Sequence, residues 1–177
     1  GKTLGVLGTG DIGREVARRA QALDLRIVGC NRSGRVRDPF ATVYPVVRLH
    51  EFLAGLDYLV VLLPRTPETD RLLDGRALAC LPVHAVLVNA GRGTCIDEAA
   101  LLVALREERL AGAVLDVFET EPLPADHPLW TAPNTLITAH VAALSEPRQI
   151  VRLFLENHRR FCAGESLQHR LDPVRGY

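Results

Sequence analysis

The sequence feature that most constrains the fold is a closely spaced set of glycines near the amino terminus. The segment VLGTGDIG, residues 6–13, follows a short apolar run at Leu4–Leu7 and opens a pattern typical of an amphipathic helix over Asp11–Leu23. A second apolar run follows at Arg26–Cys30. Strand, glycine-rich turn, helix and strand in this order predict a βαβ unit with two parallel strands.

The three glycines of this turn have separate roles in such a unit. Gly8 permits the tight turn, Gly10 lets a ligand approach the backbone, and Gly13 lets the helix pack closely on the strand. Asp11 and Ile12 are the first residues of the following helix, whose start offers free backbone N–H groups and the positive end of the helix dipole to a phosphate. The turn therefore predicts a binding site for the pyrophosphate of a dinucleotide.

Strands and helices alternate along the rest of the chain. The predicted strands are Val43–Leu49, Tyr58–Leu63, Ala85–Asn89, Ala113–Phe118 and Thr135–Thr138, and the predicted helices are Leu49–Leu56, Leu73–Leu81, Asp97–Arg109 and Glu146–Phe161. This alternation predicts an α/β fold, a Rossmann-type doubly wound parallel sheet that binds ligands at the carboxyl ends of its strands. We assign residues 1–145 to a dinucleotide-binding domain and residues 146–177 to a C-terminal helix and tail.

Apolar residues at helical spacing assign the face that each helix turns toward the core. The assigned residues are Ile12, Val16, Ala20 and Leu23 in the first helix, and Ile150, Leu153, Phe154 and Asn157 in the last. In the helix over Asp97–Arg109, Asp97 is the expected N-cap and Glu98 lies in the first turn, where a negative charge favours the helix.

The residues after the second strand indicate which dinucleotide the site prefers. Sites for NAD carry an Asp or Glu at this place, which accepts hydrogen bonds from the ribose hydroxyls and repels a 2′-phosphate. This chain has the neutral Asn31, followed by Arg32, Ser33 and Arg35. Guanidinium and hydroxyl groups are suited to binding a phosphate, so we expect NADP(H), with NAD(H) possible. The alternative is that the two arginines are solvated surface charges.

Composition and charge exclude other classes of function. The 177 residues carry 21 basic and 21 acidic side chains, so no electrostatic case exists for nucleic acid or an anionic membrane surface. No apolar run reaches the roughly 18–20 residues of a membrane-spanning helix. The four cysteines have no metal-binding spacing and are expected to be reduced thiols, as in the cytoplasm; no metal site is expected.

Three later segments carry residues typical of a catalytic site. They are NAGRG at residues 89–93, DVFETEPLP at 116–124 and TAHVAA at 138–143. Taken singly each is ambiguous, because His140 suits a buried structural histidine and Arg92 suits a surface ion pair. Each segment comes at or directly after the end of a predicted strand, however, so all three are expected at the edge of the sheet that binds ligands.

Together with HPLW at residues 127–130, these segments closely resemble the D-isomer-specific 2-hydroxyacid dehydrogenases. Within that family the chain is most similar to the NADPH-dependent glyoxylate/hydroxypyruvate reductases, which carry an NRS-like loop and a tail like DPVRGY at residues 172–177. The resemblance spans nearly the whole chain. It implies hydride transfer from NADPH to a small 2-keto acid such as glyoxylate or hydroxypyruvate, which gives a D-2-hydroxy acid.

The resemblance also implies roles for individual residues. Arg92 would bind the carboxylate and carbonyl oxygen of the substrate, and His140 would be the general acid. Glu121 would keep His140 protonated; it is preferred over Glu119 because it directly precedes a proline five residues after Asp116. Asp116 would bind the nicotinamide carboxamide. The residues expected along the nicotinamide ribose are Leu63, Pro64 and Ala90. Arg92 and His140 would also contact the cofactor.

Family members have a second domain, formed largely by an N-terminal part and completed by the C-terminus. The chain contains no Met and starts at Gly1 directly before a strand, so we expect it to be part of a longer protein. The resemblance also implies a cytoplasmic homodimer. Two alternatives stay open: an NAD-linked dehydrogenase of another 2-hydroxy acid, and a cofactor-sensing interaction module like the C-terminal-binding co-repressors, which share the Arg/Glu/His set.

Overall fold

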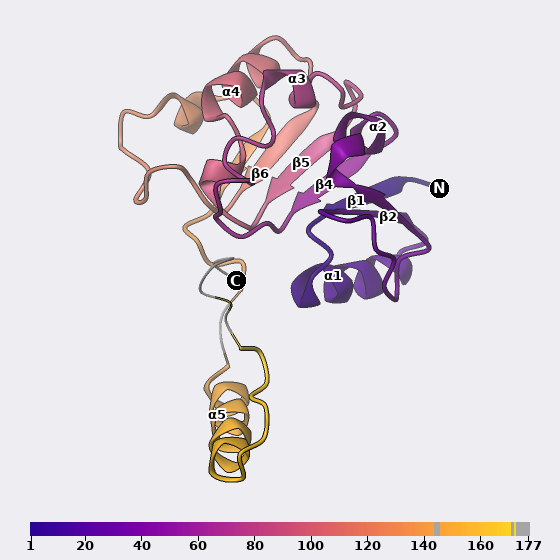
Figure 1. The fold of residues 1–177 in the computed structure, drawn as a ribbon. Coiled ribbons are helices and arrows are strands. Elements are labelled where there is room, and N and C mark those ends of the chain that lie inside the picture. Colours follow the sequence, from indigo (N-terminus) through magenta and orange to yellow (C-terminus); the bar gives the residue numbers. More distant parts are fainter. Residues whose placement is uncertain (144–145, 171, 173–177) are drawn as a thin grey trace. The chain divides into compact units, whose positions relative to one another are not determined.

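The computed structural model describes residues 1–143, 146–170 and 172 (Figure 1). Its centre is a seven-stranded sheet in the order β3-β2-β1-β4-β5-β6-β7, in which every neighbouring pair is parallel. The strands are β1 Thr3–Leu7, β2 Arg26–Asn31, β3 Thr42–Pro45, β4 Tyr58–Val61, β5 Val86–Asn89, β6 Gly112–Leu115 and β7 Thr135–Ile137. The predicted α/β class and the parallel sheet are confirmed.

The predicted helices are present. They are α1 Asp11–Gln21, α2 Leu49–Leu53, α3 Gly75–Leu78, α4 Glu98–Arg106 and α5 Pro147–Cys162, and short 3-10 turns lie at Val46–Arg48, Gly93–Cys95 and Pro128–Thr131. Helices α1 to α4 lie between strands and are shorter than predicted, and α5 follows the last strand with the predicted length, one residue later. Asp97 caps α4 as expected, because its carboxylate accepts a hydrogen bond from the Ala100 N–H at 3.0 Å. Leu73 is not helical as predicted; it forms a parallel bridge with Ile96.

The chain divides into two compact units, Gly1–His140 and Val141–Tyr177. The first contains the whole sheet and helices α1 to α4, and the second contains α5. The division falls at His140, whereas the sequence analysis placed the end of the dinucleotide-binding domain at residue 145. The segment from Pro173 to Tyr177, most of the DPVRGY tail, lies outside the described residues.

The handedness of the connections decides which face each helix covers. Helix α1 covers one face of β1 and β2, while α2, α3 and α4 cover the other face of the sheet (Figure 1). Since parallel strands are joined by right-handed crossovers, helices from connections that run in opposite directions along the sheet lie on opposite faces. The larger of the two cores therefore lies between α2–α4 and the middle of the sheet, around Leu59 and Leu87, which are fully buried.

The same rule leaves half of the α1 face open within residues 1–140. The strand register places Val60, Val86, Val88, Val114 and Leu136 on that face. The four valines are only partly buried and Leu136 is 59% exposed, because no helix of this unit packs on them. Parallel sheets are ordinarily covered on both faces, so this apolar half-face is an unusual feature of the unit.

The predicted inward face of α1 was right for Val16 and Ala20 and wrong for Ile12 and Leu23. Ala20 is buried and Val16 packs partly buried against the core, but Ile12 and Leu23 are 62% and 72% exposed, and the buried Gly13 and Ala17 were not predicted. The buried residues are the small ones, because α1 approaches the glycine-rich turn too closely for large side chains. Apolar spacing did not single out Gly13 and Ala17, since they lie one residue away from the larger apolar side chains on which the pattern was built.

The predicted inward face of α5 was also wrong, because no residue of this helix is buried. Ile150 and Phe154 are 54% and 66% exposed. Asn157 instead holds the segment after the helix: its amide donates to the Gln168 carbonyl and accepts from the Gln168 N–H at 3.1 and 2.8 Å. Exposed apolar side chains and a polar tether together indicate that α5 is stabilised locally.

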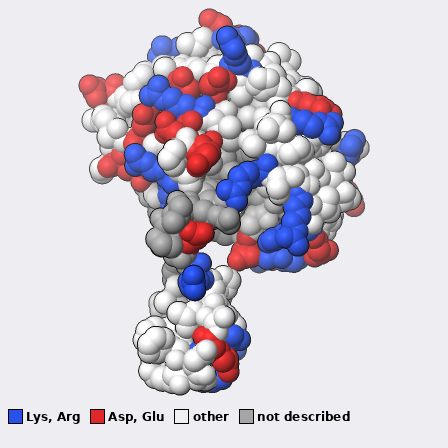
Figure 2. Space-filling model, viewed as in Figure 1, with Lys and Arg blue, Asp and Glu red and all other residues white. Residues whose placement is uncertain are grey.

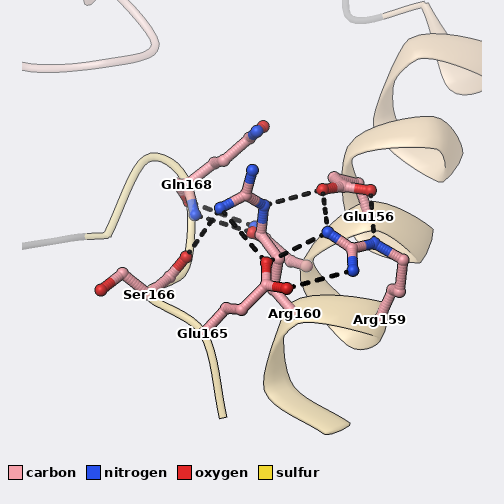
Figure 3. A network of polar contacts seen from close by, with 7 residues as sticks. Glu156, Arg159, Arg160, Glu165, Ser166 and Gln168 are labelled. Atoms are coloured by element: carbon pink, nitrogen blue, oxygen red, sulfur yellow. Dashed lines mark hydrogen bonds and ion pairs between the residues drawn. The ribbon is translucent and has the colours of Figure 1, made fainter. Parts of the chain in front are cut away.

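An ion-pair network adds to that local stabilisation (Figure 3). Arg159 pairs with Glu156 on α5 and with Glu165 beyond its end, at 3.0 and 3.1 Å. Arg160 pairs with Glu156 at 2.7 Å and donates to the Ser166 carbonyl. The bonds from the two guanidinium groups lower the pKa of Glu156 to about 2.

No helix in the described part of the chain is both long enough and apolar enough to cross a bilayer. Acidic and basic side chains are interspersed over the visible face of the molecule (Figure 2). The four cysteines, Cys30, Cys80, Cys95 and Cys162, carry no disulfide. Burial raises the pKa of the Cys30 thiol to about 12, which suits a small apolar side chain inside a strand.

We expect the contacts of Glu156 to persist at mildly acidic pH and to fail only in strong acid. A carboxylate whose pKa is lowered on folding stabilises the fold above its unfolded pKa and loses that contribution as pH falls through the folded value, here about 2. The side-chain carboxyl signal of Glu156 in NMR spectra should therefore hold its position from pH 7 to 4 and move only below that.

A matched pair of variants checks this assignment. Glu156→Gln should loosen the Gln168 amide already at neutral pH, and Glu146→Gln, at the other end of α5, should leave it unchanged. The assignment is wrong if the Glu156 carboxyl signal of the wild-type chain moves between pH 5 and 4, where an ordinary glutamate titrates.

Candidate active site

The candidate site residues follow the carboxyl ends of six strands. The chain reverses direction in the sheet between the neighbouring strands β1 and β4, where a ligand crevice is expected. The glycine-rich turn follows β1, Asn31 ends β2, and Leu63 follows β4. The residues predicted from later segments follow the same edge: Ala90 and Arg92 after β5, Asp116 and Glu121 after β6, and His140 after β7. The fold thus brings the predicted residues to one edge.

The glycines of the glycine-rich turn have steric roles in the structure: at two of them a side chain would clash, and at the third the space is open. Gly8 has a φ of +107°, and a Cβ there would lie 2.8 Å from the Leu62 carbonyl oxygen. A Cβ on Gly13 would lie 2.1 Å from the Gly8 carbonyl oxygen, so helix α1 packs directly on the turn. A Cβ on Gly10 would meet no atom within 4 Å, which leaves room at the start of α1 for a ligand phosphate.

The side chain of Asn31 makes hydrogen bonds that hold the loop after β2. Its amide nitrogen donates to the Thr9 hydroxyl at 2.8 Å and to the Arg35 carbonyl at 2.9 Å. Its oxygen accepts from the Ser33 and Gly34 N–H groups at 3.1 and 2.7 Å. Asn31 therefore closes the loop and ties it to the glycine-rich turn, and the predicted direct contact with a cofactor remains a prediction.

The loop that Asn31 closes carries the predicted phosphate-binding side chains outward. Arg32, Ser33 and Arg35 are exposed. The charge of Arg32 also helps to lower the pKa of Glu68, although a backbone hydrogen bond and a bond from Thr66 have the larger effect. Arg32 therefore lies close enough to the loop after β4 to act on its charges, and both loops border the same edge of the sheet.

The loop that carries Arg92 is held by backbone contacts and by one buried amide. Asn89, which is 1% exposed, accepts from the Gly91 N–H and donates to the Arg92 carbonyl, both at 3.1 Å. A Cβ on Gly91 would lie 2.8 Å from the Leu63 nitrogen, so the loops after β4 and β5 touch. Arg92 is exposed and lies on a fixed backbone beside the Leu63–Pro64 turn.

Glu121 and His140 form a hydrogen-bonded pair, with 2.8 Å between Glu121 Oε2 and His140 Nδ1. The other oxygen, Glu121 Oε1, accepts from the Phe118 N–H at 3.0 Å. Burial raises the pKa of Glu121, but the bonds from His140 and Phe118, with the charge of Arg92, outweigh it and hold the pKa below its usual value. The pair therefore orients an imidazole through its Nδ1 atom and directs Nε2 elsewhere.

Asp116 fixes the backbone of His140. Its carbonyl accepts the His140 N–H at 2.8 Å, and its carboxylate, in a residue that is 4% exposed, accepts from the Thr138 hydroxyl at 2.5 Å. His140 has a φ of +54°, a left-handed conformation that costs a non-glycine residue about 1–3 kcal/mol. Such a conformation at a candidate catalytic residue indicates that the surrounding bonds hold the imidazole in a required direction.

Glu119, the competing carboxylate, points away from this pair. It forms an ion pair with Arg71 at 3.3 Å, and its side chain is 45% exposed. The choice of Glu121 over Glu119 as the partner of His140 thus agrees with the observed geometry, although the catalytic role itself is not tested by it. Among the described residues, no cluster of His, Cys, Asp or Glu has the arrangement of a metal site.

Sequence reasoning missed the residues that support the site. Thr9 lies inside the glycine motif and holds Asn31, Asn89 lies inside NAGRG and holds the Arg92 loop, and Thr138 lies inside TAHVAA and holds Asp116. Each adjoins a residue that was chosen, so a small polar residue directly beside a motif residue was the available signal. The partner of each one could not be identified without the fold.

A parallel Rossmann-type sheet with an Arg/Glu/His set at its carboxyl edge defines a class of dehydrogenase. The family model for the D-isomer specific 2-hydroxyacid dehydrogenase, NAD binding domain, matches residues 1–142. The chain therefore belongs to this family.

Individual relatives agree with the family match. The chain is 36% identical over 175 residues to glyoxylate/hydroxypyruvate reductase A of Klebsiella pneumoniae (strain 342). The matched region covers 99% of this chain and 56% of the relative. It thus spans little more than half the length of that curated relative.

Two solved structures resemble the chain closely. A D-isomer specific 2-hydroxyacid dehydrogenase from Xanthobacter autotrophicus Py2, in complex with NADPH and MES, is 41% identical, with a TM-score of 0.93 over 99% of this chain and 73% of that one. An NADPH-dependent glyoxylate/hydroxypyruvate reductase from Sinorhizobium meliloti, in complex with NADP and sulfate, is 38% identical, with a TM-score of 0.92 over 99% and 57%.

We expect Gly93→Ala to disrupt the joint between the Arg92 and Glu121 loops. A Cβ on Gly93 would lie 1.8 Å from the Phe118 carbonyl carbon, so the two loops must separate. Overpacking of this kind costs about 1–3 kcal/mol, and the thermal midpoint should fall accordingly. Gly55→Ala is the matched control, because a Cβ there meets nothing within 4 Å. Equal midpoints for the two variants would show that the loops are not in contact.

Proposed function

We propose that the whole protein is an NADPH-dependent reductase of a small 2-keto acid of the glyoxylate or hydroxypyruvate kind, and that it forms a D-2-hydroxy acid. The observation that carries this proposal is the pairing of Glu121 with His140 at 2.8 Å, on the same sheet edge as Arg92 and the glycine-rich turn. It is supported by membership of the family and by relatives named as reductases of these substrates.

The arrangement suits the reduction of a carbonyl next to a carboxylate. A bound NADPH supplies the hydride to the carbonyl carbon. Arg92 binds the carboxylate through its planar donors, which directs the carbonyl toward the cofactor. His140, held at Nδ1 by Glu121, gives the proton on Nε2 to the carbonyl oxygen as the hydride arrives. One hydride and one proton convert the keto acid into the hydroxy acid, and Glu121 stabilises the imidazolium before transfer.

The residues of the site fit a dinucleotide with a 2′-phosphate. The open space at Gly10 admits the pyrophosphate to the start of α1, and Asp116 lies where the nicotinamide end is expected. The residue that ends β2 is the neutral Asn31 and not a carboxylate, and Arg32, Ser33 and Arg35 supply donors. The NADP-bound relatives support the same preference over NAD.

The organisation of the whole protein is part of the proposal. We assign residues 1–145 to the cofactor domain and residues 146–177 to the second domain, which the rest of a longer chain forms. The support is that the chain spans 56% of its curated relative and that α5 exposes Ile150 and Phe154. A cytoplasmic homodimer with no nucleic-acid or membrane partner completes the proposal; Trp130, 51% exposed, is a candidate contact between subunits.

We expect this chain to bind NADPH more tightly than NADH and to lose that preference in Arg32→Asp. Hydrogen bonds to charged groups contribute about 1.5–3 kcal/mol, which corresponds to a roughly 10- to 100-fold weaker affinity for NADPH when the arginine is reversed in charge. The measurement is a fluorescence titration with Trp130, the one tryptophan of the chain, as the energy donor.

A control variant separates a bound phosphate from general charge effects. Arg37→Asp changes the net charge equally on the same exposed segment, so it should leave the NADPH preference intact. If NADH binds as tightly as NADPH to the wild-type chain, the two arginines are surface charges. That result would favour an NAD-linked dehydrogenase or a cofactor-sensing interaction module instead.

Turnover tests the chemistry separately from binding. We expect the 177-residue chain alone to bind the dinucleotide but to reduce glyoxylate poorly, because relatives are longer and the substrate needs both domains. In the whole protein, His140→Gln should lower kcat about 100- to 10,000-fold with NADPH affinity retained, as expected for a general acid. A His140→Gln enzyme with normal kcat would remove His140 from the mechanism.

A further inference from the structure

Glu98 is a largely buried carboxylate that the proposed chemistry does not use. It is the first residue of α4, and its side chain is only 13% exposed. Oxygen Oε1 accepts the Glu119 N–H at 2.7 Å, and Oε2 lies 3.6 Å from His127 Nε2. Burial raises the pKa of Glu98, opposed by the Glu119 N–H and by His127. An acid that only favoured the helix dipole would not need to be buried.

His127 presents a proton to this carboxylate. Its Nδ1 atom accepts the Leu129 N–H at 3.4 Å, so the proton of the neutral ring is on Nε2, the atom that faces Glu98. Helix α4 is thereby connected to two separate points of the segment between β6 and β7: the backbone at Glu119 and the side chain at His127. These two points lie on either side of Glu121.

The backbone around Phe118 is held by three contacts. The Glu121 carboxylate accepts the Phe118 N–H, which belongs to the peptide with Val117, at 3.0 Å, and the Glu98 carboxylate accepts the Glu119 N–H, which belongs to the peptide between Phe118 and Glu119, at 2.7 Å. The third is Gly93, whose missing side chain would fall 2.1 Å from the Phe118 carbonyl oxygen. This peptide therefore joins the loop of Arg92 to the loop of Glu121, and Glu98 holds it in place from α4.

We propose that Glu98 is a positioning residue for the active site: it fixes the Phe118–Glu119 peptide and so sets where the Glu121 carboxylate meets His140. The inference rests on the proposed function for its catalytic meaning and on the geometry alone for its structural meaning. The contacts of Glu98 are with the Glu119 N–H and with His127, so it acts through the backbone. A shift of about 1 Å in a positioned catalytic group can cost on the order of 100-fold in rate.

Three variants separate this role from a helix-dipole effect. Glu98→Ala removes the acceptor and the charge. Glu98→Gln removes only the charge, because the amide oxygen can still accept the Glu119 N–H. Glu107→Gln, at the other end of α4 in an exposed pair with Arg109, is the matched control. Thermal midpoints and circular dichroism first establish that each variant folds.

The deciding readout is hydrogen exchange at the Phe118 N–H, which Glu98 does not contact. In the 177-residue chain we expect Glu98→Ala to speed this exchange at least about 10-fold and to raise the pKa of Glu121 measured by carboxyl NMR, because the Phe118 N–H lowers it. Glu98→Gln should stay near the wild-type values. In the whole enzyme, Glu98→Ala should lower kcat and Glu98→Gln should leave it near the wild-type value, with the KM for NADPH unchanged in both.

The outcomes distinguish failure of this inference from failure of the proposed function. If Glu98→Ala and Glu98→Gln speed the exchange of the Phe118 N–H equally, Glu98 acts only through its charge, and the positioning role is wrong. If Glu98→Ala folds and leaves the Phe118 exchange unchanged, the role is also wrong. If the exchange changes as expected but the wild-type whole protein reduces no 2-keto acid, the positioning role holds and the proposed substrate is wrong.

Discussion

The all-parallel pairing of seven short strands is the constraint on which the site depends. Parallel strands place their carboxyl ends at one edge, and the reversal between β1 and β4 opens the crevice in which loops from both halves meet. No strand exceeds six residues, so the loops at this edge lie close to the core and close to one another. Residues more than one hundred positions apart, such as Gly10 and His140, thus border one site.

Strand ends alone do not fix loops, and here polar side chains do so; Thr9, Asn89 and Asp116 are buried, and Asn31 and Thr138 are partly buried. Thr9 and Asn31 join the loops after β1 and β2, Asn89 closes the loop after β5, and Thr138 and Asp116 join the loops after β6 and β7. A buried polar atom left without a partner costs about 1–3 kcal/mol, so each of these contacts resists displacement. The result is an edge whose loops are rigid while Arg92 and His140 stay exposed to a substrate.

The sequence predicted the elements well because each carries its own local signal: apolar runs for strands, Asp97 for the start of α4, and glycine spacing for the turn. It also predicted which candidate residues meet, since strand ends converge. It predicted the inward face of α1 only in part, because close packing there also uses Gly13 and Ala17, which are not large apolar residues. Glu98 was predicted only as a helix-start charge, because its partner lies on a loop whose path depends on the whole sheet.

Asn31 indicates that the cofactor preference we propose depends on the shape of the loop after β2 as well as on its charge. An Asp at this position would still accept the Ser33 and Gly34 N–H groups, but it would offer an oxygen where the Asn31 amide now donates to the Arg35 carbonyl. Two oxygens 2.9 Å apart repel, so the loop would open there. The neutral amide therefore removes a charge that repels phosphate and also holds Arg32 and Arg35 on one closed loop. A single side chain meets both requirements of a 2′-phosphate site.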